Sequence, residues 1–166
     1  MKMCAVAAAA LMFVSVTAFA QTNAAKASNV GTWKLDVAKS SFGSEPAPKS
    51  VTLTILKDTP ELGSWSIDLV DDKGQSMSFS WTGPQDGSMQ PVKGPKGEVI
   101  AQESLKRDKD GALLRHGVDA RDGSTFDARS TLSADGNTIT DVMTQKTKDG
   151  KTSKSTAIYH RVTTAK

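Results

Sequence analysis

The sequence predicts an all-β protein, folded as a single antiparallel up-and-down β-barrel of eight or nine strands. Three observations support this prediction: apolar and polar residues alternate with a period of two, Asp-Gly pairs recur between the alternating runs, and no segment shows helical periodicity. A length of 166 residues suits one domain. A β-sandwich is the alternative, although that fold normally needs long crossover connections, which are not evident in this sequence.

The first twenty residues are expected to be a signal peptide. Lys2 precedes an apolar run from Ala5 to Val16, and Ala18-Phe19-Ala20 offers small residues at the positions that signal peptidase reads. The run is shorter than the roughly 20 residues of a membrane-spanning helix. We therefore expect an exported protein, periplasmic or extracellular, with no membrane span in the mature chain. Residues 21–30 are expected to form a flexible leader to a barrel domain at 31–166.

Alternation is clearest in three runs, at residues 51–56, 64–70 and 76–82. In the last of these, Met77, Phe79 and Trp81 alternate with serines, as in a strand with one buried face. Extending the same analysis along the chain predicts nine strands, at 32–36, 51–56, 64–70, 76–82, 98–105, 112–119, 124–132, 138–144 and 153–162.

The connections between these runs favour tight turns. Asp and Gly tolerate the positive φ of hairpin turns, and five Asp-Gly pairs begin at residues 86, 110, 122, 135 and 149. One longer connection, 83–97, is rich in proline and glycine and is expected to be a loop across a barrel mouth or a ragged hairpin. At most one turn of helix is expected, around 37–41, since Pro46 and Pro48 follow.

Charge and cysteine content exclude several classes of function. The formal net charge is +3, but basic residues alternate with acidic ones along the chain, so we expect no nucleic-acid surface. The single cysteine, Cys4, precedes the apolar run and would be removed with the signal peptide. The mature chain then has no disulfide, thiolate metal site or cysteine nucleophile.

Catalytic motifs are not evident, and we expect neither an enzyme nor a bound cofactor or metal. His116 and His160 each fall in a predicted strand, and neither has a second ligand at a useful spacing. Asp108 and Asp110 begin like a calcium loop but lack the later acidic ligands, so a turn is the better interpretation. No Gly-x-Ser-x-Gly elbow is present.

Both ends of the domain resemble a group of uncharacterised exported bacterial proteins with a lipocalin-like domain. The shared features are a Trp-Lys-Leu-Asp start, Ala-Pro-Lys-Ser, a Ser-x-Asp-Gly-x-Thr turn and a last strand that contains Tyr, within residues 31–55 and 130–161. The resemblance implies fold and export rather than an activity. In lipocalins a Gly-x-Trp on the first strand packs beneath a basic residue of the last strand and closes the barrel. By this resemblance, Gly31, Trp33 and Arg161 would close one end.

Aromatic residues on the presumed inner face provide the functional hypothesis. Trp65, Phe79, Trp81 and Phe126 share that face, and a barrel of this size either packs solid or holds one small ligand. The first hypothesis is a monomer that binds a small apolar or amphipathic ligand, with these four residues as cavity walls. The alternative is a non-enzymatic cell-envelope interaction or structural protein with a solid core.

Overall fold

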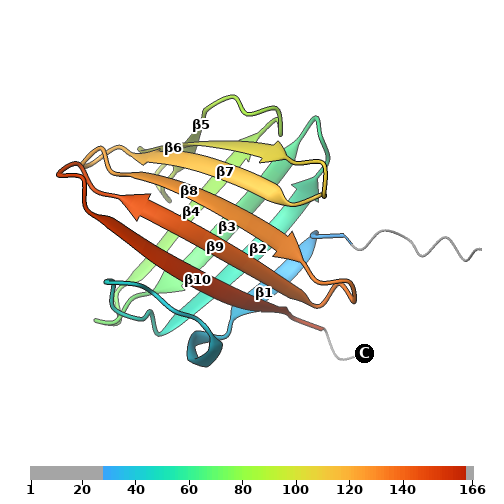
Figure 1. The fold of residues 1–166 in the computed structure, drawn as a ribbon, viewed down its shortest axis with the longest axis horizontal. Helices are drawn as coiled ribbons and strands as arrows, with labels where there is room; N and C mark the ends of the chain where they lie inside the picture. The colour runs from blue at the N-terminus through green and yellow to red at the C-terminus, as the bar shows by residue number, and fades with distance from the viewer. Residues whose placement is uncertain (1–27, 164–166) are drawn as a thin grey trace, which may run out of the picture.

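Ten antiparallel strands form one closed ring in the computed structural model, which describes residues 28–163 (Figure 1). Each strand pairs with its neighbours in the sequence, and β10 pairs with β1. The predicted up-and-down barrel is confirmed, whereas the β-sandwich alternative is wrong because the ring closes on itself. The elements are β1 (Gly31–Leu35), the short 3₁₀ helix η1 (Val37–Lys39), β2 (Ser50–Asp58), β3 (Gly63–Val70), β4 (Ser76–Gly83), β5 (Gln90–Lys93), β6 (Val99–Arg107), β7 (Leu113–Asp119), β8 (Thr125–Leu132), β9 (Thr138–Lys146) and β10 (Thr152–Arg161).

The prediction of eight or nine strands is wrong by one or two, and β5 is the strand that the sequence conceals. It lies inside the 83–97 connection and contains Pro91, which has no N–H to donate to a ladder. Its register with β4 covers only two residue pairs. Val92, only 3% exposed, belongs to the buried cluster that contains Trp81. Burial of the Val92 side chain therefore holds β5 in the sheet, although the sequence of β5 shows no alternating pattern.

The turns form as the Asp-Gly pairs predict. All five glycines of these pairs have φ between 71° and 91°, and four of the pairs connect consecutive strands from β6 to β10. The expected single turn of helix is η1, in which the Asp36 carboxylate accepts a hydrogen bond from the backbone N–H of Lys39. Residues after η1 run beside β10, where Ser41 pairs with Thr156 (Figure 1).

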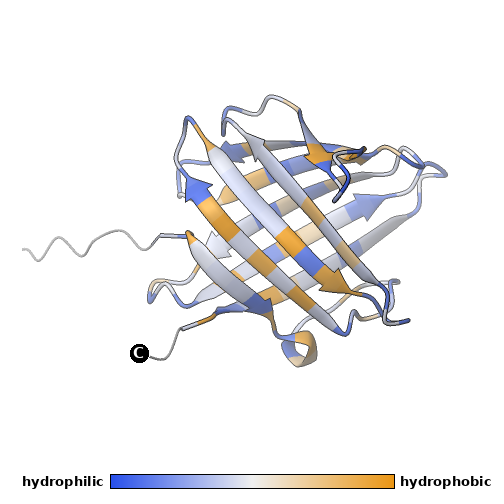
Figure 2. Cartoon of the chain, turned by 180° about the vertical axis from the view of Figure 1, so that it is seen from behind, coloured by the Kyte–Doolittle hydropathy of each residue, from blue (hydrophilic) through white to orange (hydrophobic). Residues whose placement is uncertain are grey.

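Alternation along the strands separates the inside of the barrel from the outside. Figure 2 shows hydrophobic residues interleaved with polar ones along the strands at the back of the barrel. On the inner side, the indoles of Trp65 and Trp81 stack with centroids 6.5 Å apart, and Phe79 meets Trp65 edge-on at 6.1 Å. With Val92 and Leu105 they form an apolar wall contributed by β3 to β6.

The predicted signal peptide, 1–20, and most of the predicted leader, 21–30, lie outside the described residues. The last three residues of that leader are described, and they hydrogen-bond with one end of the barrel. The Asn29 side chain donates to Asp58 over 2.8 Å, and the backbone carbonyls of Ser28 and Val30 accept from Arg161. Within 28–163, no helix has the length and apolar character needed to cross a membrane.

Gly31, Trp33 and Arg161 meet at this same end. Trp33 is fully buried and pairs in register with Arg161, whose guanidinium carbon lies 4.1 Å from the indole centroid. Arg161 is also fixed by its hydrogen bond to the Gly136 carbonyl, 2.8 Å long. Gly31 has a φ of 142°, and a Cβ there would lie 2.6 Å from Nη1 of Arg161. Glycine is therefore required both by the backbone conformation and by the arginine that covers it.

We expect Gly31→Ala to lower the free energy of unfolding by about 3 kcal/mol, because the variant combines a strained φ with displacement of the Arg161 guanidinium. Gly123→Ala is the matched control: its φ is 72°, but a Cβ there would meet no atom within 4 Å. The control should cost about 1 kcal/mol. Urea unfolding followed by tryptophan fluorescence measures both. Equal losses in the two variants would show that the contact with Arg161 contributes nothing.

Candidate functional site

The barrel interior contains a cavity of about 90 Å³ between two unlike walls. The apolar side is formed mainly by Leu53, Ile55, Trp65, Ile67 and Leu105, from β2, β3 and β6. The opposite side carries four polar side chains from β7 to β10, namely Arg115, Ser130, Asp141 and Tyr159. An apolar space with a few convergent polar groups is the usual character of a small-molecule site.

Arg115 organises the polar side. Its Nη2 donates to Asp141 over 2.7 Å, and its Nη1 donates to Glu103 over 3.5 Å. Ser130 donates its hydroxyl proton to the other oxygen of Asp141. The side chains of Glu103 and Arg115 are only 4% and 19% exposed. Buried charges are tolerated only when paired and hydrogen-bonded, so Arg115 and its two carboxylates form one electrostatic unit.

The environment shifts the pKa of three of these groups. Burial raises the pKa of Glu103 above its usual range, and the Asp141 charge adds to this effect despite the opposing influence of Arg115. Burial lowers the pKa of Arg115, but the charges of Asp141 and Glu103 outweigh it and raise the pKa overall. Burial and the Asp141 charge raise the pKa of Tyr159 to about 12. Arg115 is therefore always a cation at neutral pH, and Tyr159 always keeps its proton.

Two hydrogen-bond donors in the cavity lining have no partner among the described residues. They are Nε1 of Trp65 and Nε of Arg115, and both atoms are buried. Leaving a buried donor unpaired costs about 1–3 kcal/mol. Each nitrogen would gain a hydrogen bond from an acceptor that a bound molecule places beside it.

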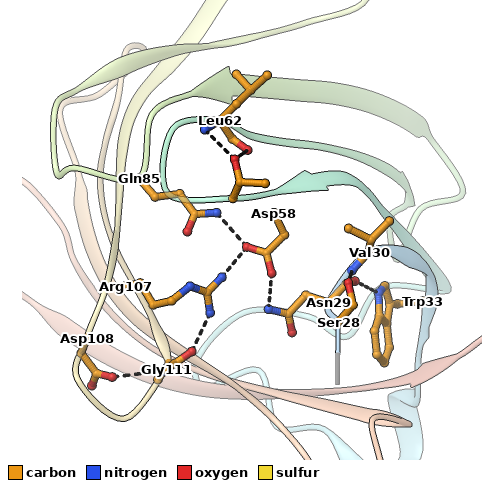
Figure 3. Close-up of polar contacts among 12 residues, drawn as sticks. Ser28, Asn29, Val30, Trp33, Asp58, Leu62, Gln85, Arg107, Asp108 and Gly111 are labelled. Atoms are coloured by element: carbon orange, nitrogen blue, oxygen red, sulfur yellow. Dashed lines mark hydrogen bonds and ion pairs between the residues drawn. The ribbon is translucent and has the colours of Figure 1, made fainter. Parts of the chain in front are cut away.

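A network around Asp58 forms part of the rim above the cavity. Its carboxylate, 8% exposed, accepts hydrogen bonds from Asn29 and from Gln85, at 2.8 and 2.7 Å, and from Arg107 (Figure 3). Arg107 also donates to the Gly111 carbonyl over 2.6 Å. One carboxylate thus ties together the leader, β2, the residues after β4, and β6.

The rim encloses an outer space of about 360 Å³ that continues into the inner cavity. Four lining residues belong to both spaces: Asn29, Gly111, Thr131 and Leu132. The outer space is the more polar of the two and includes Arg107 and Arg129. Asn29 and Gly111 therefore connect the Asp58 network with the approach to the cavity.

The four predicted wall residues all point inward but differ in their relation to the cavity. Trp65 lines it, whereas Phe79 and Trp81 lie behind Trp65 in the apolar wall. Phe126 packs across Gly117, where a Cβ would meet its ring at 2.2 Å, and its centroid lies 5.8 Å from the Arg115 guanidinium carbon. A ligand contact by any of the four remains a prediction.

Sequence reasoning missed the charged residues of the polar wall. The signal that could have found them is their position in the alternation. Arg115 falls at the inward-facing positions of β7, two residues from Leu113 and two from Gly117, and Asp141 falls at those of β9, two residues after Ile139. A charge in the apolar phase of an alternating strand indicates either a buried ion pair or a functional site.

The two histidines lie on the outer face and do not converge. His116 on β7 pairs with Asp127 at 2.9 Å, and His160 on β10 pairs with Asp36 at 3.2 Å, with β8 and β9 between them. Neither histidine lines the cavity or the outer space. Residues 28–163 contain no group of three His, Cys, Asp or Glu side chains placed to hold a metal ion.

Comparison with known proteins shows the fold but not a family. No protein-family model matches the chain, and no curated protein is significantly similar to it. Among solved structures, a mutant of the fluorescent protein UnaG is similar, with a TM-score of 0.53 and 15% sequence identity. The match covers 81% of this chain and 96% of the other. The likeness supports the closed antiparallel β-barrel fold.

The raised pKa of Glu103 predicts how stability depends on pH. Since the pKa is higher in the folded than in the unfolded chain, the contribution of Glu103 is full below its ordinary value of 4.5 and is lost as pH rises through the raised pKa. Glu103→Gln cannot ionise. Its stability relative to the wild type should therefore rise as the pH increases from about 4.5 through the raised pKa of Glu103.

Urea unfolding at a series of pH values measures this difference. Glu45→Gln is the control for replacing a glutamate by glutamine, since Glu45 is exposed on the connection between η1 and β2. A difference between Glu103→Gln and wild type that stays flat, or falls with pH, would contradict the assignment.

Asp58→Asn should lower the free energy of unfolding by about 3 kcal/mol, because it leaves Arg107 without its buried counter-charge. Asp68→Asn is the control. Asp68 is exposed and accepts one hydrogen bond, from Ser78, so its replacement should cost less than about 1 kcal/mol. Chemical unfolding of both variants tests this, and equal losses would show that the Asp58 network does not stabilise the rim.

Proposed function

We propose that this protein binds a small apolar or amphipathic molecule inside the barrel. The observation that carries the proposal is the cavity in which an apolar wall faces buried donors that lack partners. A barrel of this class has room for one small ligand. The cavity favours this function over the solid-core alternative.

The size of the cavity limits the ligand. An apolar cavity of about 150 Å³ is known to hold benzene, whereas the inner space here is about 90 Å³. A narrow chain fits this space better than a bulky ring. A longer molecule would extend past Gly111 and Leu132 into the outer space, which shares these residues with the inner cavity.

We also propose that the chain acts outside the cytoplasm as a monomer. Export rests on the sequence of residues 1–20, with their apolar run and small residues before Gln21. The monomer rests on closure, because a ring without free edges offers no strand for pairing with a second copy.

A cavity-filling substitution tests the proposal. Leu113 lines the cavity, and the next residue, Leu114, is 38% exposed on the outer face of β7. Leu113→Trp should weaken binding at least about tenfold by occupying the space that a ligand needs, while Leu114→Trp should leave it unchanged.

Isothermal titration calorimetry of wild type and both variants with 1-octene, 1-octanol, 2-octanone and octane-1-sulfonate provides the measurement. Binding by the wild type that Leu113→Trp abolishes supports the site. No binding of any compound by the wild type, or equal binding by both variants, would overturn the proposal.

A further inference from the structure

The charges of the cavity lining balance. Arg115 contributes one cation, and Glu103 and Asp141 are the two carboxylates that pair with it. Glu103 does not line the cavity, so the charges of the lining, Arg115 and Asp141, sum to zero. An anion that enters the cavity would meet a cation already neutralised, and it would have to compete with Asp141 for the Arg115 guanidinium.

Two hydrogen-bond donors of the lining residues have no partner in the described part of the chain. Nε1 of Trp65 and Nε of Arg115 are buried without partners among residues 28–163. Asp141 is already engaged: one of its oxygens accepts from Arg115 and the other from Ser130. The hydroxyls of Ser130 and Tyr159 can accept as well as donate, so the lining favours an acceptor group through its two unpartnered donors and not through a lack of acceptors.

We propose that the cavity selects a neutral molecule whose apolar body carries a hydrogen-bond acceptor, such as a ketone, ester or ether oxygen, and that it discriminates against charged groups, both anions and ammonium ions, which would have to compete with the Arg115–Asp141 pair. This inference rests on the proposed function. The acceptor oxygen lies toward Trp65 and Arg115, and the apolar body lies against Leu53, Ile67 and Leu105. Arg115 supplies one of the two donors, and its pairing with Asp141 disfavours the binding of anions.

The ligand classes are distinguished by four probes that share an eight-carbon chain. These are 2-octanone, octane-1-sulfonate and octylammonium, with 1-octene as a probe that has no conventional acceptor. With wild-type protein at neutral pH, 2-octanone should bind at least about tenfold more tightly than the sulfonate or the ammonium ion, since only the ketone satisfies a donor without adding charge.

The outcomes separate the two proposals. If no probe binds, the proposed function fails, and the inference fails with it. If the sulfonate or the ammonium ion binds as tightly as the ketone, the selectivity proposed here is wrong, although the cavity remains a binding site.

Two variants test which residues provide the selectivity. Trp65→Phe keeps an aromatic ring but removes the indole N–H, so it should weaken the binding of 2-octanone at least about fivefold more than the binding of 1-octene. Asp141→Asn removes one negative charge, so it should raise the affinity for the sulfonate relative to the ketone by about tenfold. Asp127→Asn, on the outer face of the neighbouring strand, is the matched control and should change neither ratio.

Circular dichroism first establishes that each variant is folded. A Trp65→Phe protein that loses affinity for both probes equally would overturn the role of the indole N–H. An unchanged sulfonate-to-ketone ratio in folded Asp141→Asn would overturn the role of the charge. If either variant does not fold, the wild-type affinities for the four probes still decide the proposal.

Discussion

A buried arginine is the constraint on which the interior of this barrel depends. Arg115 is directed into a space that the alternation of its strand otherwise reserves for apolar residues. Its charge requires Asp141 from β9 and Glu103 from β6, so three strands are tied together on the inside. Close packing of apolar side chains around these polar groups would break their hydrogen bonds. The side of the interior that carries them is therefore polar, whereas the other side is apolar.

The two walls follow from this arrangement. Trp65 and Trp81 stack within the apolar wall. Trp81 also donates to the backbone carbonyl of Glu103 over 3.0 Å, which joins this wall to β6, the strand that carries one of the two carboxylates paired with Arg115. The opposite wall places small or polar side chains, Ala128 and Ser130, beside Arg115 and Asp141. Space remains between the walls, and the networks of Asp58 and Arg161 hold one end of the barrel around it.

Much of the fold could be predicted because local sequence patterns determine where its strands and turns lie. Period-two runs such as Met77 to Trp81 locate strands, and Asp-Gly pairs locate hairpins, without knowledge of distant contacts. β5 was not predicted because Pro91 interrupts its alternating pattern and the strand is held in place by burial of Val92. The polar wall of the cavity was not predicted for a related reason: Arg115 and Asp141 are 26 residues apart, and only the closed register brings their charges together. Inward aromatic residues could be identified from the sequence, but the choice of Trp65 over Phe126 as a lining residue requires the three-dimensional packing.

The central claim is that Arg115 and Asp141 stabilise each other within the barrel. A double-mutant cycle with Arg115→Met and Asp141→Leu, measured by urea unfolding, tests it directly. We predict that each single variant loses about 3–5 kcal/mol, because it leaves a buried charge unpaired, and that the double variant loses much less than the sum of the two. Additive losses would contradict the account, since they would show that the two residues do not form one electrostatic unit.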